Sequence, residues 1–157
     1  MPEESIIPKE LKEMLGVEEE PRVWEIEKGH IKRYAEAVGD PNPFWQDEAY
    51  ARKSRYGNII APPLFHEEQT MVGFVDKVLA VLDRIKYPLT GFFNAASEFE
   101  YYRPTMPGDV ITSVAKLVDL YEKQGKSGKM LFFVCEATAT NQRGELVSIA
   151  RESFVKL

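Results

Sequence analysis

The chain has 157 residues, with 25 acidic and 20 basic side chains, so its formal net charge is −5. Hydrophobic residues make up 44% and aromatic residues 11%, which excludes disorder over most of the length. The acidic balance argues against nucleic acid as the main partner, and the length fits one domain over 1–157 with an N-terminal extension over 1–21.

Three features set the expected cellular setting. The N-terminus lacks the basic segment and the following apolar segment of a secretory signal. No apolar run reaches the roughly 20 residues that a membrane-spanning helix needs. Cys135 is the single cysteine, so neither an internal disulfide nor a zinc cluster is expected. We expect a cytoplasmic protein with no membrane partner, no metal and no cofactor.

The first elements follow from residue spacing and from glycines that end helices. Residues 8–15 are predicted to form a short helix that Gly16 ends. Residues 23–27 alternate in polarity and include strong strand formers, which predicts a strand. A second helix is predicted to end at Gly39, because the preceding apolar residues have helical spacing: Ile31, Tyr34, Ala35 and Val38.

The middle of the chain is predicted to contain the longest helix. Residues 40–43 carry two prolines and are predicted to be non-helical. Asp47 is a good N-cap for a short helix that ends near Ser54, and residues 57–58 indicate a turn. From Pro62 to Leu82 the apolar residues recur three and four apart, which predicts one continuous helix about 30 Å long.

The C-terminal third changes to strand periodicity. A strand is predicted over 97–102, ended by Arg103-Pro104, and a turn over 106–109. Three further strands are predicted over 110–120, 129–140 and 145–156. Their short, glycine-containing connections favour antiparallel neighbours, which is the arrangement of a meander. One long apolar helix before antiparallel strands indicates the α+β class.

One motif narrows this prediction to a family. The segment from Gly39 to Asp47, Gly-Asp-Pro-Asn-Pro-Phe-Trp-Gln-Asp, resembles the hydratase motif of MaoC-like enzymes, in which Gly-Asp-x-Asn-Pro-apolar-His precedes an acidic residue. The stretches 56–61, 99–104 and 107–109 also resemble that family, so the resemblance covers 22–157. It implies a hot-dog fold, an antiparallel sheet wrapped around a long central helix. Taken alone, the motif also fits a plain turn.

The resemblance implies catalytic roles that this chain only partly keeps. In the R-specific enoyl-CoA hydratases of the family, an Asp and a His hold a water and share general acid and base work. Asp40 matches the acid, but Trp45 stands at the histidine position. Indole does not titrate in the working range and cannot move the proton. Losing the histidine is expected to cost about 10²–10⁴ in rate.

A second departure affects the expected oxyanion donor. The family places a glycine near the start of the central helix, whose N–H holds the thioester oxygen. Ala61-Pro62-Pro63-Leu64 matches that stretch, so Pro63 replaces the glycine and has no N–H to donate. Losing one such donor typically costs about 10²–10³ in rate.

The remaining candidates are substrate contacts and substitute proton donors. The resemblance places substrate contacts at Asn42, Pro63, Leu64, Phe65, Tyr102 and Arg103. His66, in the first turn of the predicted helix, and Tyr102 are the candidates for a substitute donor. A surface or groove-edge position fits His66 better than a donor role, because Glu67 and Glu68 follow it.

Three functional hypotheses follow. The first is a non-catalytic subunit that binds an acyl-CoA or enoyl-CoA substrate and pairs with a catalytic MaoC-like subunit. The second is a self-sufficient enoyl-CoA hydratase, for example a homodimer, that uses Asp40 with a different proton donor. The third is a non-enzymatic acyl-CoA-binding or regulatory hot-dog protein. The activity of the isolated chain separates the first hypothesis from the second.

Overall fold

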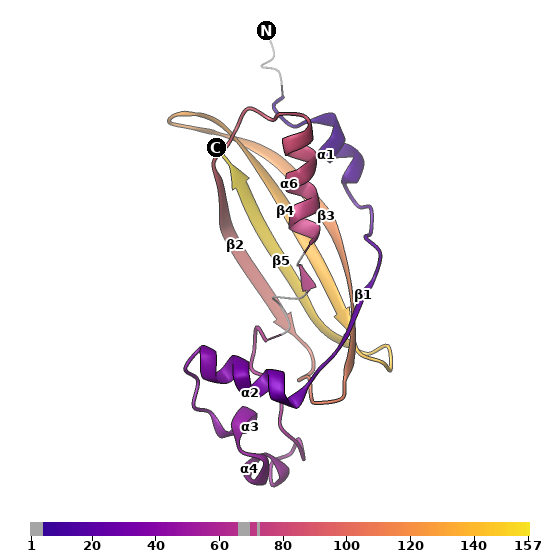
Figure 1. Cartoon of the computed structure of the whole chain (residues 1–157). Helices are drawn as coiled ribbons and strands as arrows, with labels where there is room; N and C mark the ends of the chain where they lie inside the picture. Colours follow the sequence, from indigo (N-terminus) through magenta and orange to yellow (C-terminus); the bar gives the residue numbers. More distant parts are fainter. Residues whose placement is uncertain (1–4, 66–69, 72) are drawn as a thin grey trace.

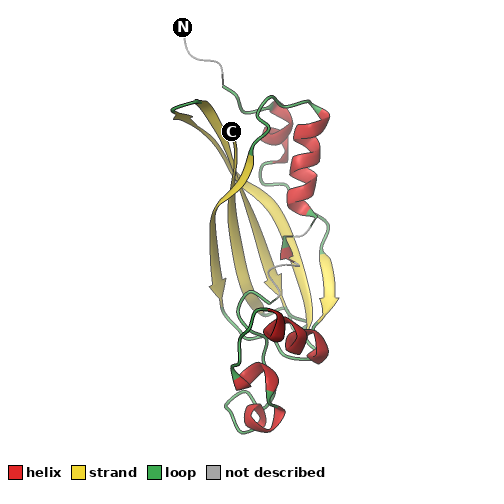
Figure 2. Ribbon diagram, turned by 60° about the vertical axis from the view of Figure 1, so that its left-hand side comes forward, coloured by secondary structure: helices red, strands yellow, loops and turns green. Residues whose placement is uncertain are grey.

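The computed structural model describes residues 5–65, 70–71 and 73–157, and its main feature is a five-stranded antiparallel sheet (Figure 1). The spatial order of the strands is β1-β3-β4-β5-β2. Helices α1 and α6 pack on one face of the sheet, and three short helices gather at one end (Figures 1 and 2). The strands are β1 (Arg22–Glu25), β2 (Phe92–Tyr101), β3 (Val110–Gly125), β4 (Gly128–Thr140) and β5 (Leu146–Lys156).

The predicted meander is confirmed. Strands β3, β4 and β5 are consecutive antiparallel neighbours, and only two residues connect β3 to β4. Buried and less buried residues alternate along β4, as expected for a sheet with one face on a core. Strand β2 begins at Phe92, five residues earlier than the sequence predicts, and forms the edge beside β5.

The prediction of one continuous helix from Pro62 to Leu82 is wrong at its N-terminal end. Residues 63–65 form a turn in which Leu64 has a φ of 69°, and α6 (Phe74–Arg84) begins after Gly73, whose φ is 84°. Left-handed backbone ends a helix because it breaks the repeating hydrogen-bond geometry. The central helix therefore has 11 residues, or about 16 Å. Two residues of its predicted apolar stripe, Val78 and Leu82, are buried, and so is Phe74, which the predicted stripe did not include.

The N-terminal segment packs against the same core as α6. Helix α1 (Lys9–Met14) matches the predicted helix, and its Leu11 is fully buried. The Gly16 N–H donates to the Leu117 carbonyl at 2.7 Å, which attaches the segment to the sheet beside β3. Residues 5–21 are therefore part of the folded domain.

Three helices form a cap at the end of the sheet: α2 (Lys28–Ala37), α3 (Pro43–Gln46) and α4 (Glu48–Arg52). The prediction that residues 40–43 are non-helical is wrong at Pro43, which is the first residue of α3, a position that tolerates proline. Asp47 caps α4 as predicted, although α4 ends at Arg52 rather than near Ser54. A second core joins the cap to the sheet and includes Ile31, Phe65 and Val147.

Candidate functional site

The motif from Gly39 to Asp47 folds as a chain of local hydrogen bonds. The Asp40 carboxylate accepts from the Asn42 N–H at 3.0 Å, and the Asn42 side chain accepts from the Phe44 N–H at 3.0 Å. The Gln46 side-chain amide donates to the Asp40 carbonyl at 2.8 Å. Short polar side chains favour such turns because they replace backbone partners. This arrangement alone accounts for the residue types at Asp40 and Asn42.

We predict that Asp40 acts mainly as a turn residue. Asp40→Asn keeps the accepting oxygen, so its free energy of unfolding is expected to stay close to that of the wild type. Asp40→Ala removes the acceptor, and its expected cost is about 1 kcal/mol. Urea denaturation of both variants measures the difference, and equal losses in the two variants would contradict this role.

Trp45 forms a wall between two pockets on the cap side of the molecule. Only 8% of its surface is exposed, and its indole N–H is buried without a hydrogen-bond partner among the described residues. Trp45, Tyr56 and Ile60 line both pockets. The position where the sequence resemblance expects an acid–base histidine is therefore occupied by a non-titrating aromatic wall.

The first of these pockets, called the apolar pocket here, has a volume of about 320 Å³. Its described lining residues include no carboxylate, imidazole or thiol, so they offer no acid–base pair for adding or removing water. The lining residues are Trp45, Tyr56, Ile60, Ala61, Pro62, Pro63, Tyr101, Tyr102, Arg103, Pro104 and Thr105.

The second pocket, called the basic pocket here, has a volume of about 780 Å³. Two cations lie in its described lining and no acidic residue does. The lining residues are Asn42, Phe44, Trp45, Tyr50, Lys53, Ser54, Arg55, Tyr56 and Ile60.

The backbone over 61–65 offers few donors to a ligand in the apolar pocket. Pro62 and Pro63 have no N–H. The Ala61 N–H donates to the Thr105 carbonyl at 2.8 Å and the Phe65 N–H to the Pro62 carbonyl at 3.2 Å. The remaining N–H, that of Leu64, donates to the Tyr101 hydroxyl at 3.1 Å. No amide of this stretch is left open as an oxyanion donor.

Tyr102 lies in the apolar pocket but its hydroxyl is engaged. It donates to the Glu100 carboxylate at 2.9 Å, and Glu100 also pairs with Arg151 at 2.9 Å. The hydrogen bond to Glu100 raises the pKa of Tyr102 above its ordinary value, so the phenol keeps its proton at neutral pH. The hydrogen bonds from Tyr102 and Arg151 lower the pKa of Glu100.

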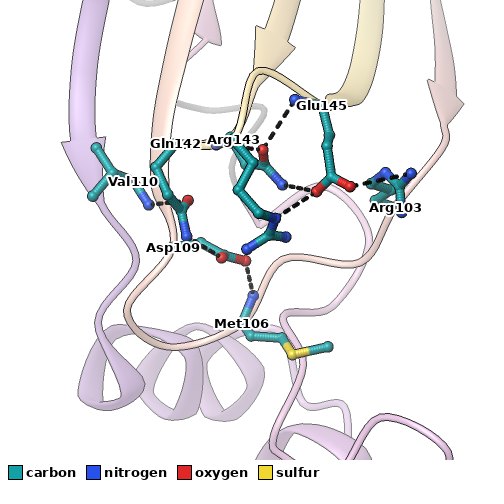
Figure 3. A network of polar contacts seen from close by, with 8 residues as sticks. Arg103, Met106, Asp109, Val110, Gln142, Arg143 and Glu145 are labelled. Atoms are coloured by element: carbon teal, nitrogen blue, oxygen red, sulfur yellow. Dashed lines mark hydrogen bonds and ion pairs between the residues drawn. The ribbon is translucent and has the colours of Figure 1, made fainter.

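Arg103 is held at the pocket rim by a polar network at the β4–β5 turn (Figure 3). Its guanidinium lies 3.4 Å from the Glu145 carboxylate, which also accepts from the Arg143 Nε at 2.8 Å. Hydrogen bonds from the Asn141 amide and from Arg143, with the nearby charge of Arg103, lower the pKa of Glu145.

The same network fixes the loop that forms one side of the pocket. Asp109 accepts from the Met106 N–H at 2.9 Å and from the Gln142 amide at 3.1 Å (Figure 3). The Met106 bond closes the 106–109 turn, which confirms the turn that the sequence predicts there, and the Gln142 bond joins this turn to the β4–β5 connection.

The structure brings together some of the predicted site residues. Pro63, Tyr102 and Arg103 line the apolar pocket, and Asn42 lines the basic pocket. Asp40 and Leu64 line neither, and Phe65 is fully buried in the second core. His66 lies outside the described residues.

Sequence reasoning missed several lining residues, namely Tyr56, Ile60, Tyr101 and Thr105. Tyr101 reaches Leu64 although 37 positions separate them. No local pattern signals a contact of this kind, because it forms between the end of β2 and the distant turn at 63–65.

Other reactive groups give no second candidate centre among the described residues. Cys135 is buried in the core, where burial raises the pKa of its thiol to about 12. No group of three or more His, Cys, Asp or Glu side chains is placed to hold a metal in the described part of the chain. No helix there is long and apolar enough to cross a membrane.

The sequence matches a known dehydratase family and its relatives. The profile of the "FAS1-like, dehydratase domain region" family matches residues 13–150. A "UPF0336 protein" of Thermobifida fusca is 30% identical over 121 residues, which cover 76% of each chain. The "Probable enoyl-CoA hydratase alpha subunit" of Thermomonospora curvata is 30% identical over 134 residues, which cover 77% of this chain but 41% of that protein.

Solved structures show the same architecture. A chain of the ChsH1–ChsH2 complex of Mycobacterium tuberculosis superimposes with a TM-score of 0.76 at 25% identity, over 89% of this chain and 84% of that one. The MaoC-like dehydratase of Rhodospirillum rubrum superimposes with a TM-score of 0.64 at 26% identity, over 91% and 92% of the two chains.

Proposed function

Because the chain belongs to the FAS1-like dehydratase region family of MaoC-like hot-dog proteins, we propose that it is the non-catalytic, acyl-thioester-binding subunit of a heteromeric enoyl-CoA hydratase or dehydratase. The observation that carries this proposal is the chemistry of the apolar pocket. Its described lining holds no carboxylate or imidazole, and the motif-matched Asp40 is bound in a turn outside it. A pocket of this kind can hold an acyl chain but lacks the groups for proton transfer.

The relatives support a partner subunit. One carries the name of an alpha subunit, and the similar solved structure is a complex of two proteins. In this proposal the partner supplies the acid, the base and the oxyanion donor. This chain supplies the aromatic and proline-rich wall over 60–63 and 101–105 that shields the thioester from bulk water.

A self-sufficient hydratase remains the alternative proposal, and Tyr102 is the observation that favours it. Its protonated phenol lines the apolar pocket. A proton donor must also release its proton, however, and the hydrogen bond to Glu100 opposes ionisation of this one. Tyr102→Phe would abolish the activity of the isolated chain only if this alternative holds.

The test is the activity of the chain with and without a partner. The isolated chain is expected to hydrate crotonyl-CoA no faster than buffer does, followed as the loss of enoyl-thioester absorbance. Co-expression with a MaoC-like chain that has an intact Gly-Asp-x-Asn-Pro-x-His motif is expected to yield an active complex. Asp40→Asn in this chain should leave that activity in place, whereas His→Ala in the partner's motif should abolish it.

Robust hydration by the isolated chain, lost on Asp40→Asn, which keeps the turn but removes the carboxylate, and kept in Lys126→Ala, would overturn the proposal. Lys126 is a suitable control because it lies at the β3–β4 turn, away from both pockets.

A further inference from the structure

The basic pocket has a chemical character that the acyl-binding role does not use. Its described lining combines the cations Lys53 and Arg55 with four aromatic rings and contains no acid, although the chain as a whole carries a net charge of −5. A concave site with cations and aromatic faces but no acid fits an anionic ligand that also has a planar ring.

The aromatic part of the basic pocket is ordered around Phe44. The Tyr50 ring meets Phe44 edge-on at 5.3 Å between centroids, and the Tyr56 ring does so at 5.8 Å. Tyr50 is 48% exposed, so it can present ring surface to a ligand. Rings fixed in this way offer stacking area at a low entropic cost.

The contacts of Lys53 and Arg55 differ from those of the neighbouring Arg52. The Arg55 guanidinium lies 4.8 Å from the Tyr56 ring centroid and donates to the Tyr56 hydroxyl at 2.5 Å, which holds it beside the pocket. Lys53 is exposed and has no ion pair among the described residues. Arg52, by contrast, pairs with Glu48 at 3.7 Å and does not line the pocket. Two adjacent cations are therefore available to an anion.

The basic pocket adjoins the apolar pocket. Trp45, Tyr56 and Ile60 line both, so one extended ligand can place its ends on the two sides of this shared wall. An acyl-CoA has this form, because an adenosine head with phosphates is joined by a long arm to an apolar acyl group.

We propose that the basic pocket binds the phosphorylated adenosine head of coenzyme A, with Lys53 and Arg55 on the phosphates and Tyr50 against the ring. This inference rests on the proposed function, since the acyl end of the same molecule occupies the apolar pocket. It assigns the recognition of the CoA head to this subunit.

Calorimetric titration of the full chain with matched ligands tests the assignment. Lys53→Ala/Arg55→Ala is expected to weaken the binding of butyryl-CoA at least about tenfold, because two charge-assisted contacts to phosphate are lost. The same double variant should bind butyryl-pantetheine, which lacks the nucleotide, as the wild type does. Arg52→Ala is the matched control and should bind both ligands normally. All three cations are exposed, and circular dichroism checks that the variants fold.

A competition experiment tests whether the adenosine head alone occupies the basic pocket. Adenosine 3′,5′-bisphosphate should displace butyryl-CoA but not butyryl-pantetheine. Equal affinity of the double variant and the wild type for butyryl-CoA would overturn the assignment while leaving the proposed function intact. Failure of the wild type to bind either thioester, alone or with its partner, would overturn both.

Discussion

Replacing Trp45 with alanine is expected to lower the free energy of unfolding by about 3–5 kcal/mol. The indole is 8% exposed and belongs to the second core, which joins the cap helices to the sheet. Trp45 lines both the apolar and the basic pocket, so its removal takes away their shared wall and the packing contacts of the indole. Urea denaturation of the full chain gives the loss directly.

Trp45→Phe is the matched control for this prediction. Phenylalanine keeps most of the aromatic wall and removes an N–H that is buried without a partner among the described residues. A buried, unpaired donor costs about 1–3 kcal/mol, which offsets the smaller volume of the new side chain. The stability of Trp45→Phe is therefore expected to lie within about 1 kcal/mol of the wild type. A loss well above about 1 kcal/mol in this variant would contradict this offset.

The same two variants also test whether Trp45 contacts the bound acyl group. Trp45→Ala removes a wall of the apolar pocket, so the affinity for butyryl-pantetheine is expected to fall even at temperatures where the variant is folded. Trp45→Phe is expected to keep most of that affinity. Unchanged binding by Trp45→Ala would mean that the acyl group does not lie against Trp45.

The sequence predicts the sheet well because its signals are local. Buried and less buried residues alternate along the first part of β3 and along β4, short turns join β3, β4 and β5, and Gly125 and Gly128 close the β3–β4 hairpin. Period and turn chemistry are enough to define such a meander. Helix α6 shows the opposite case. Its apolar stripe is readable, but its start depends on Leu64 and Gly73, whose left-handed backbone no periodicity reveals.

For the candidate site, the sequence predicts only the features that a single motif position defines. The substitutions at Trp45 and Pro63 are visible in the sequence because a family motif defines what each position should carry. The Leu64–Tyr101 hydrogen bond is not, since it forms when the end of β2 meets the turn at 63–65. A motif therefore shows which chemistry is missing, whereas the pocket itself is made by long-range contacts.

For the N-terminal segment too, long-range contacts rather than the local sequence determine whether it belongs to the folded core. The sequence marks 1–21 as an extension, yet Leu11 is fully buried in the core cluster of α6. The Ile6 N–H donates to the Glu122 carboxylate at 2.8 Å, and the Tyr87 hydroxyl donates to the Ile6 carbonyl at 2.7 Å. These contacts tie the segment both to β3 and to the chain after α6.

Leu11→Ala is accordingly expected to lower the free energy of unfolding by about 2–5 kcal/mol, as for other fully buried leucines. Leu15→Ala is the matched control, because Leu15 follows α1 in the same segment but is 46% exposed, and its expected change is within about 0.5 kcal/mol. Urea denaturation of both variants decides the matter. If the two substitutions are equally well tolerated, the segment is not part of the cooperative core. A large loss for Leu11→Ala alone means that α1 and α6 unfold together with the sheet, so the domain includes its N-terminal helix.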